Sequence, residues 1–139
     1  MSFHSWFFLI LFIKIQLNNL SNFISLQKAI EMTTLYRTQM DTILADEYKG
    51  QDILVKSEVF SKEQVEKLLA KPGCGFLRIY YGMSQDLKVH ALLVSANGSS
   101  EDILCSGEHA TSEAAEDVLE EADRCPPFCP PTSPLNPIK

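Results

Sequence analysis

Proline is almost missing from most of this 139-residue chain, because Pro72 is the only proline before residue 125. Long apolar runs are missing as well: the longest, Trp6–Ile13, has eight residues and is followed by Lys14. A membrane-spanning helix needs about 20 mostly apolar residues. The run is therefore too short for such a helix, and we expect no membrane partner unless residues 1–31 form a genuine anchor.

Motifs that bind phosphate or carry catalysis are also missing. The sequence has no phosphate-binding loop, no nucleophile elbow and no zinc-type pair of cysteine motifs. Lysine and arginine do not cluster, and residues 101–139 carry nine acidic but only two basic side chains. Nucleic-acid binding depends on such clusters, since they contact phosphates. We expect no nucleic-acid partner, no catalytic residue, no metal site and no cofactor, and hence a protein that is not an enzyme.

The first 31 residues differ from the rest in composition, with no Gly, Pro, Cys, Val or Asp. They can be interpreted as a signal or anchor, as a packed helix, or as sequence upstream of a true start at Met32. A signal peptide normally has a basic start and a small-residue cleavage site, and neither is present. A start at Met32 predicts a cytoplasmic protein, whereas a genuine N-terminal segment predicts export.

The remaining sequence divides into three parts by composition. Residues 32–106 carry the patterns of a small α+β domain, residues 107–124 form an acidic linker or short helix, and residues 125–139 form a Cys/Pro-rich tail. Apolar spacing predicts a helix over Thr34–Tyr48 and an extended segment over Asp52–Val59. In the acidic part, Val118, Leu119 and Ala122 have helical spacing, but disorder is an equal alternative.

A second helix is predicted from Lys62 to about Ala70. Ser61 and Gln64 have the spacing of a capping box, in which each side chain accepts a hydrogen bond from a free backbone N–H at the helix start. Phe60 and Val65 are placed to form a hydrophobic staple around the cap. Pro72 and Gly73 end the helix.

A β-hairpin follows, with strands over Phe76–Tyr81 and Leu87–Ser95 and a loop over Gly82–Asp86. Ile103–Cys105 is a candidate third strand. The sequence thus predicts a small antiparallel sheet, a hairpin or three-stranded meander, packed on one or two helices. Its core of about 55 residues is marginal in size, so a homodimer or another partner is expected to contribute stability.

One face of the predicted hairpin gathers polar side chains. If Tyr81 lies opposite Leu87, then Arg78 lies opposite His90, with Tyr80 and Lys88 beside them. Together, Arg78, Tyr80, Lys88 and His90 are a candidate anion-binding face. The alternative is that they are solvated side chains on the open face of an antiparallel sheet.

The tail combines six prolines with two cysteines and one aromatic residue. Such a segment suits a disordered or polyproline II conformation that a protein partner binds, because its conformation is already formed before docking. The candidate partner-binding residues are Cys125, Pro126, Pro127, Phe128, Cys129, Pro130 and Pro131. The sequence therefore predicts a non-enzymatic interaction module that presents this tail to a protein partner.

The four cysteines support a second hypothesis, that of a thiol-redox or metal-responsive protein. In polyproline II, the Cα atoms of Cys125 and Cys129 lie about 12 Å apart, beyond the limit of about 7 Å for a disulfide. A local bridge therefore requires a turn, for example through a cis proline. Bridges from the tail to Cys74 or Cys105 are the alternative in an exported protein.

The chain resembles a family of small uncharacterised bacterial proteins. The resemblance rests on Arg78-Ile-Tyr-Tyr-Gly-Met83, on Leu87-Lys-Val-His-Ala-Leu-Leu-Val94 and on the tail motif Cys125-Pro-Pro-Phe-Cys-Pro-Pro131. Members of that family generally start near the position of Met32. The resemblance implies no activity, but it favours the late start and indicates that the tail is a real feature of the protein.

Overall fold

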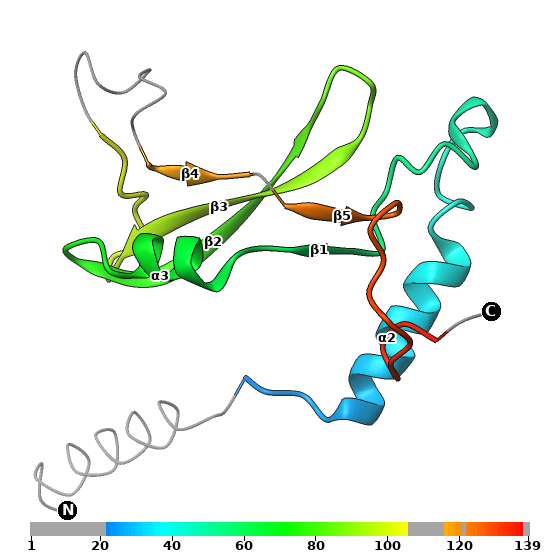
Figure 1. The fold of residues 1–139 in the computed structure, drawn as a ribbon, viewed down its shortest axis with the longest axis horizontal. Coiled ribbons are helices and arrows are strands. Elements are labelled where there is room, and N and C mark those ends of the chain that lie inside the picture. Colours follow the sequence, from blue (N-terminus) through cyan, green and yellow to red (C-terminus); the bar gives the residue numbers. More distant parts are fainter. Residues whose placement is uncertain (1–21, 106–115, 121, 138–139) are drawn as a thin grey trace, which may run out of the picture.

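The computed structural model describes residues 22–105, 116–120 and 122–137. It confirms an α+β fold, with two α-helices and two small antiparallel sheets in the described residues (Figure 1). The elements are, in chain order, α2 (Leu26–Gln39), a 3₁₀ turn η1 (Asp46–Tyr48), β1 (Ser57–Val59), α3 (Lys62–Leu69), β2 (Cys74–Met83), β3 (Val89–Asn97), β4 (Val118–Leu119) and β5 (Asp123–Cys125).

Helix α2 begins eight residues before its predicted start. The hydroxyl of Ser25 accepts a hydrogen bond from the backbone N–H of Lys28 at 3.1 Å and so caps the helix. The predicted extension to Tyr48 is wrong, because the helix ends at Gln39 and only η1 is helical beyond it. Within the described ranges, neither helix combines the length and the apolar character needed to cross a membrane.

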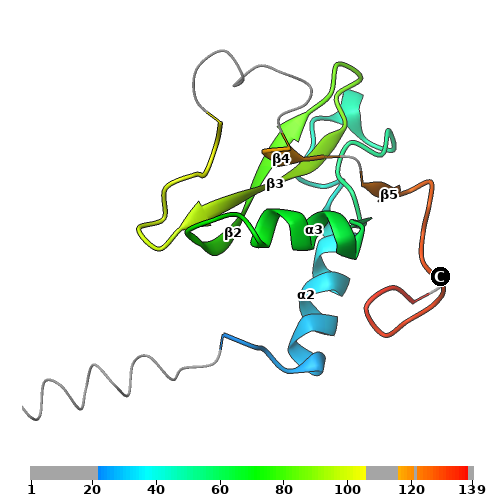
Figure 2. The same ribbon diagram turned by 60° about the vertical axis from the view of Figure 1, so that its left-hand side comes forward.

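Helix α3 confirms the second predicted helix, with Ser61 at its N-cap. The predicted capping-box contact is wrong, since the Ser61 side chain makes no capping hydrogen bond. The backbone carbonyl of Ser61 instead accepts from the N–H of Val65 at 3.1 Å, which closes the first turn. Leu68 is the buried residue of this helix and packs where α3 lies across the hairpin (Figure 2).

The hairpin of β2 and β3 confirms the predicted pairing of these two segments but not their register. Tyr81 lies opposite Ala91 rather than Leu87, and Arg78 lies opposite Val94 rather than His90. The connecting loop is 84–88, not 82–86, because Gly82 lies within the strand. A Cβ atom at Gly82 would lie 2.9 Å from Leu92 Cδ1, so this position serves close cross-strand packing rather than a turn.

The third strand of this sheet is β4, not the predicted Ile103–Cys105. Sheet order is β2-β3-β4, with Leu93 opposite Leu119. Ile103 does run beside β3 and donates its N–H to the carbonyl of Ser95 at 2.9 Å, but it forms no regular strand. The predicted helical stripe is wrong for Val118 and Leu119, since both lie in β4.

The core is small and centres on β3, where Leu93, Val94, Ser95 and Ala96 are all buried. The hydroxyl of Ser95 donates to the carbonyl of Leu68 at 2.6 Å and joins β3 to α3. The two-stranded sheet of β1 and β5 is fastened to β3 through side chains. Glu58 Oε2 accepts from the N–H of Ala91 at 2.8 Å, on the side of β3 away from β2 and beyond the residues that pair with β4.

Candidate functional site

The Pro-rich segment begins in the fold, not outside it. Its first residue, Cys125, ends β5, which pairs antiparallel with β1 so that Ser57 lies opposite Cys125 and Glu58 opposite Arg124. The Arg124 guanidinium donates to the carbonyls of Asp52 and Ile53, both at 2.8 Å, and its Nε donates to that of Val89 at 3.2 Å. These contacts fix the point from which the rest of the segment projects.

Cys125 and Cys129 form a disulfide, with their Cα atoms 4.5 Å apart. The extended polyproline II backbone considered for these residues is wrong, and the turn that a local bridge requires is present. Both Cys125-Pro126 and Pro126-Pro127 are cis peptide bonds. The buried cysteine is Cys125, whereas Cys129 is exposed.

Phe128 lies within this five-residue ring and is 68% exposed. Its backbone N–H donates to the carbonyl of Arg124 at 2.9 Å, so its position is tied to β5. Pro126 is half-buried, while Pro127, Pro130 and Pro131 are exposed. The predicted partner-binding residues therefore form one continuous surface segment around the disulfide, with Cys125 as its buried anchor.

Residues 133–137 fold back beside α2. Ser133 and Asn136 exchange backbone hydrogen bonds of 3.2 and 3.0 Å, which makes a tight turn. Arg37 of α2 donates from Nη1 to the carbonyl of Leu135. Between Asp123 and Pro137 the tail thus has local structure, a strand, a disulfide and a turn, that the sequence prediction did not include.

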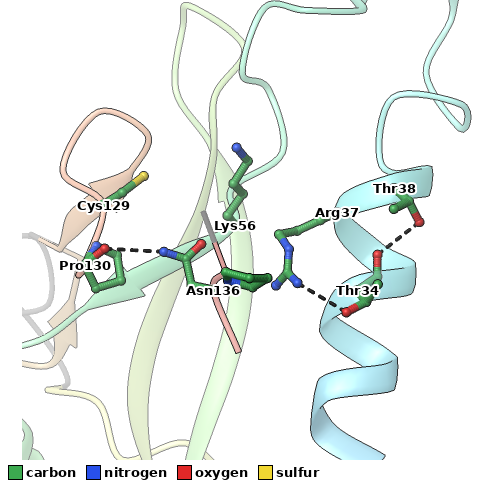
Figure 3. Close-up of a pocket in the computed structure, with 8 residues that line it drawn as sticks. Thr34, Arg37, Thr38, Lys56, Cys129, Pro130 and Asn136 are labelled. Carbon is green, nitrogen blue, oxygen red and sulfur yellow. Dashed lines mark hydrogen bonds between the residues drawn. The ribbon is translucent and has the colours of Figure 1, made fainter. Parts of the chain in front are cut away.

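A cavity of 390 Å³ lies between α2, the start of β1 and this turn (Figure 3). In Figure 3, Arg37 points from α2 toward the turn, where the side-chain amide of Asn136 bonds to the carbonyl of Pro130 at 3.4 Å. The lining residues are Thr34, Arg37, Thr38, Lys56, Cys129, Pro130, Asn136 and Pro137. Exposed Cys129 thus borders a mostly apolar cavity whose lining includes the cationic side chains of Arg37 and Lys56.

The candidate anion-binding residues are not brought together as one group. Arg78 and Tyr80 both bind Asp102: the guanidinium pairs with one carboxylate oxygen and the phenol donates to the other at 2.6 Å. Arg78 also donates to the carbonyl and hydroxyl of Ser100. The hydrogen bond with Tyr80 is the main cause that raises the pKa of Arg78 above its ordinary value. An anion at this point would have to displace Asp102.

Lys88 and His90 contact other parts of the molecule. Lys88 Nζ donates to the carbonyl of Gln51. His90 Nδ1 lies 3.1 Å from a Glu120 oxygen and 3.7 Å from Glu58 Oε1, so it faces two carboxylates. In the observed register, His90 lies opposite Gly82 rather than opposite Arg78.

A second cavity, of 430 Å³, lies where α2 and the approach to β1 meet the loop end of the hairpin. It is mostly apolar, with one carboxylate, and is lined by Tyr36, Leu54, Val55, Glu58, Tyr81, Val89 and Ala91. Burial is the main cause that raises the pKa of Tyr36, whose hydroxyl donates to the carbonyl of Val55 at 2.7 Å. Glu58 Oε1 is buried and accepts no hydrogen bond, although Oε2 does.

The two remaining cysteines are free thiols, Cys74 half-buried and Cys105 exposed. Cys105 meets Asp117, which accepts a hydrogen bond from the Cys105 backbone N–H at 2.6 Å. A hydrogen bond to Asp117 is the main cause that raises the pKa of the Cys105 thiol. Across the part of the chain that the structure describes, no three His, Cys, Asp or Glu side chains are grouped as metal ligands.

Sequence reasoning missed the side chains that hold this site in place: Arg37, Glu58 and Arg124. Arg124 is the one lysine or arginine among residues 101–137. A single cation in this acidic stretch, directly before Cys125, could have suggested a structural role. Nothing in the local sequence pairs Arg37 with Leu135, 98 residues away.

No protein-family model, no curated protein and no solved structure matches this chain. The resemblance to small bacterial proteins therefore stays a prediction.

Proposed function

We propose that this chain is a non-enzymatic protein-interaction module that presents its Pro-rich segment, residues 125–131, to a protein partner. The observation that carries the proposal is the exposure of Phe128 on a ring closed by the Cys125–Cys129 disulfide. A large aromatic side chain that a monomer leaves in water is a typical interface anchor. The closed ring also lowers the ordering cost of binding, because fewer backbone conformations are lost.

The hydrogen bond from the Phe128 N–H to the Arg124 carbonyl also supports a role of Phe128 as an anchor, because it fixes the backbone of Phe128 next to β5. Prolines on both sides offer apolar surface without free N–H groups that would need partners. A pocket that buries one aromatic side chain is the kind of partner surface that accepts such a segment.

Site-specific photocrosslinking in cells tests this proposal. A photoreactive phenylalanine analogue at position 128 is expected to yield a covalent adduct with one partner protein, identified by mass spectrometry. The same analogue at Ile43, which is also exposed but lies outside the tail, is the matched control. We expect no such adduct from position 43.

Once that partner is identified, Phe128→Ala is expected to weaken its binding to the full chain by at least tenfold, as loss of an aromatic anchor typically costs 2 kcal/mol or more, at about 1.4 kcal/mol per factor of ten. Deleting residues from Arg124 onward is unsuitable as a test, because Arg124 binds three backbone carbonyls of the domain. Equal binding by wild type and Phe128→Ala would reject the proposal.

The disulfide favours a second candidate function, thiol-disulfide exchange with a small-molecule or protein thiol. We propose that an external thiolate attacks the exposed Cys129 sulfur, forms a mixed disulfide and releases Cys125 as a thiolate. A second external thiol then attacks the mixed disulfide and frees Cys129. The external thiols leave as a disulfide, and the protein gains two electrons and two protons.

Equilibration with glutathione buffers of graded ratio tests the second candidate. A redox-responsive pair is expected to be half reduced within the range of cellular glutathione buffers, whereas a structural bridge stays oxidised there. A metal-responsive role is tested with the reduced protein. Zinc is titrated into it, and the number of free thiols is counted at each step. A bridge that stays oxidised throughout that range rejects this candidate and leaves the interaction proposal untouched.

A further inference from the structure

Strand β2 lies at an edge of the three-stranded sheet, with β3 on one side and no strand of the described residues on the other (Figure 1). It is ten residues long, and a free edge of this length pairs with another strand unless charges, prolines or bulges prevent it. β2 contains no proline, and its one register irregularity lies at its start, between Cys74 and Phe76, so that the ladder from Phe76 to Met83 is regular. Its one charged residue, Arg78, is already paired with Asp102.

The backbone groups that face this free edge follow from the hydrogen bonds of β3. The N–H of Ala91 is directed to Glu58 and the carbonyl of Ser95 to Ile103, both away from β2. In an antiparallel ladder, two opposed residues form a non-hydrogen-bonded pair when their backbone N–H and C=O groups point away from the partner strand. Tyr81 and Leu77, opposite Ala91 and Ser95, therefore direct their own N–H and C=O groups to the free edge. By alternation, Ile79 and Met83 do the same.

The strand also exposes much apolar surface. Phe76 is 55% exposed, Tyr80 43% and Tyr81 81%. At about 200 Å² for a whole aromatic side chain, these three residues expose roughly 350 Å². The exposed parts of Leu77, Ile79 and Met83 add to this area. A stable interface buries about 800 Å² per partner, so this one strand supplies a large share of what a dimer needs.

We propose that β2 pairs antiparallel with β2 of a second copy of this chain, and that the two three-stranded sheets join into one of six strands. A second copy fits because an antiparallel edge is complementary to itself, so the same surface serves both partners. It fits electrostatically as well, since Arg78 is the only charge on the strand and Asp102 neutralises it within each copy.

The register of the pair is centred on Tyr80. Ile79 then lies opposite the second copy's Tyr81, and Leu77 opposite its Met83, which are favourable apolar pairs. Tyr80 faces its own symmetry mate, and Arg78 lies opposite Gly82, where no side chain competes for space. A register centred on Ile79 would bring the two Arg78 side chains to diagonal positions about 7–8 Å apart, where like charges repel.

Sedimentation equilibrium of the full chain tests the pairing. We expect a mass of twice 15.6 kDa for the wild type. Tyr81→Lys is expected to shift the protein to a monomer with an unchanged circular dichroism spectrum, because Tyr81 is almost fully exposed and contributes little to the fold. Phe128→Lys, an equally drastic change at an exposed aromatic in the tail, is expected to leave the dimer intact.

Disulfide trapping tests the register, in a background with Cys74→Ser and Cys105→Ser. Tyr80→Cys is expected to form a disulfide-linked dimer on mild oxidation, since opposed residues of a non-hydrogen-bonded pair have close Cβ atoms. Ile79→Cys, whose mate lies two positions away in this register, is expected to cross-link much less.

A monomeric wild type, or a dimer that survives Tyr81→Lys, overturns the pairing. Preferential cross-linking of Ile79→Cys overturns the register. The result is independent of the proposed function: loss of partner binding in Phe128→Ala concerns the tail alone, and loss of the dimer in Tyr81→Lys concerns β2 alone.

Discussion

Asp117 is a buried acidic residue that accepts hydrogen bonds from two segments far from it in the sequence. One carboxylate oxygen accepts from Lys71 Nζ at 2.6 Å and the other from the backbone N–H of Cys105. The hydrogen bond with Lys71 is the main cause that lowers the pKa of Asp117 from its ordinary value of 3.8. The residue joins the end of α3, the segment after β3 and the approach to β4.

We predict that Asp117→Asn lowers the free energy of unfolding at pH 7 by about 1.5–3 kcal/mol, the value of a hydrogen bond to a charged group. A lowered folded-state pKa stabilises the fold above the unfolded pKa, and this stabilisation is lost as the pH falls through the folded value. The difference between wild type and variant should therefore shrink in urea unfolding below about pH 4. Glu116→Gln, whose ion pair with Lys67 is exposed, is the control and should change little.

Cys105 offers a second prediction at the scale of one residue. It is exposed, yet its thiol pKa is raised by Asp117, so the reactive thiolate is scarce at neutral pH. We predict slow alkylation of Cys105 by iodoacetamide at pH 8 and a faster rate in Asp117→Asn. Peptide mass spectrometry measures both rates, with Cys74 in the same protein as the internal reference. Equal rates in the two proteins would show that Asp117 does not control this thiol.

At the scale of elements, α3 depends on one buried side chain. Leu68 is buried against the hairpin, whereas the neighbouring Leu69 is about half exposed. We predict that Leu68→Ala lowers the free energy of unfolding by about 2–5 kcal/mol and that Leu69→Ala costs much less, because only the first leaves a cavity. Denaturant unfolding of both variants measures the difference. Similar losses would mean that α3 does not pack through Leu68.

The same elements show how far the sequence could predict the fold. The position of α3 and the pairing of β2 with β3 were predictable, because Ser61, Pro72 and the β-branched residues are local signals. The hairpin register was not predictable, because a glycine at position 82 fits either a turn or a tight cross-strand contact. The close approach of Leu92 requires the second, and the local sequence does not indicate this contact.

The candidate site was predictable in part for a similar reason. Composition alone singled out residues 125–131, and the exposure of Phe128 agrees with a displayed segment. The Cys125–Cys129 disulfide stayed one of several alternatives, because no local pattern in the sequence sets the chain direction between the two cysteines. Strands β4 and β5 were also not predicted, because two or three residues are too few to show a periodic pattern. They are strands because they pair with β3 and β1.

In the molecule as a whole, β5 pairs with β1, so that backbone hydrogen bonds join the start of the tail to the domain. Cys125 is among the most buried side chains in the described residues. Any loosening of the ring should therefore reach the domain through β5 and Arg124. We therefore expect the stability of the domain to depend on the oxidation state of the tail.

We predict that reduction of the Cys125–Cys129 disulfide lowers the free energy of unfolding of the full chain by about 2 kcal/mol, the loop-entropy value for a five-residue ring. Denaturant unfolding with and without a thiol reductant measures the change. A Cys74→Ser, Cys105→Ser variant should respond like the wild type, because it keeps the bridge. A Cys125→Ser, Cys129→Ser variant should not respond at all. If the wild type is equally stable in both conditions, β5 pairs with β1 independently of the ring, and the disulfide serves the displayed segment alone.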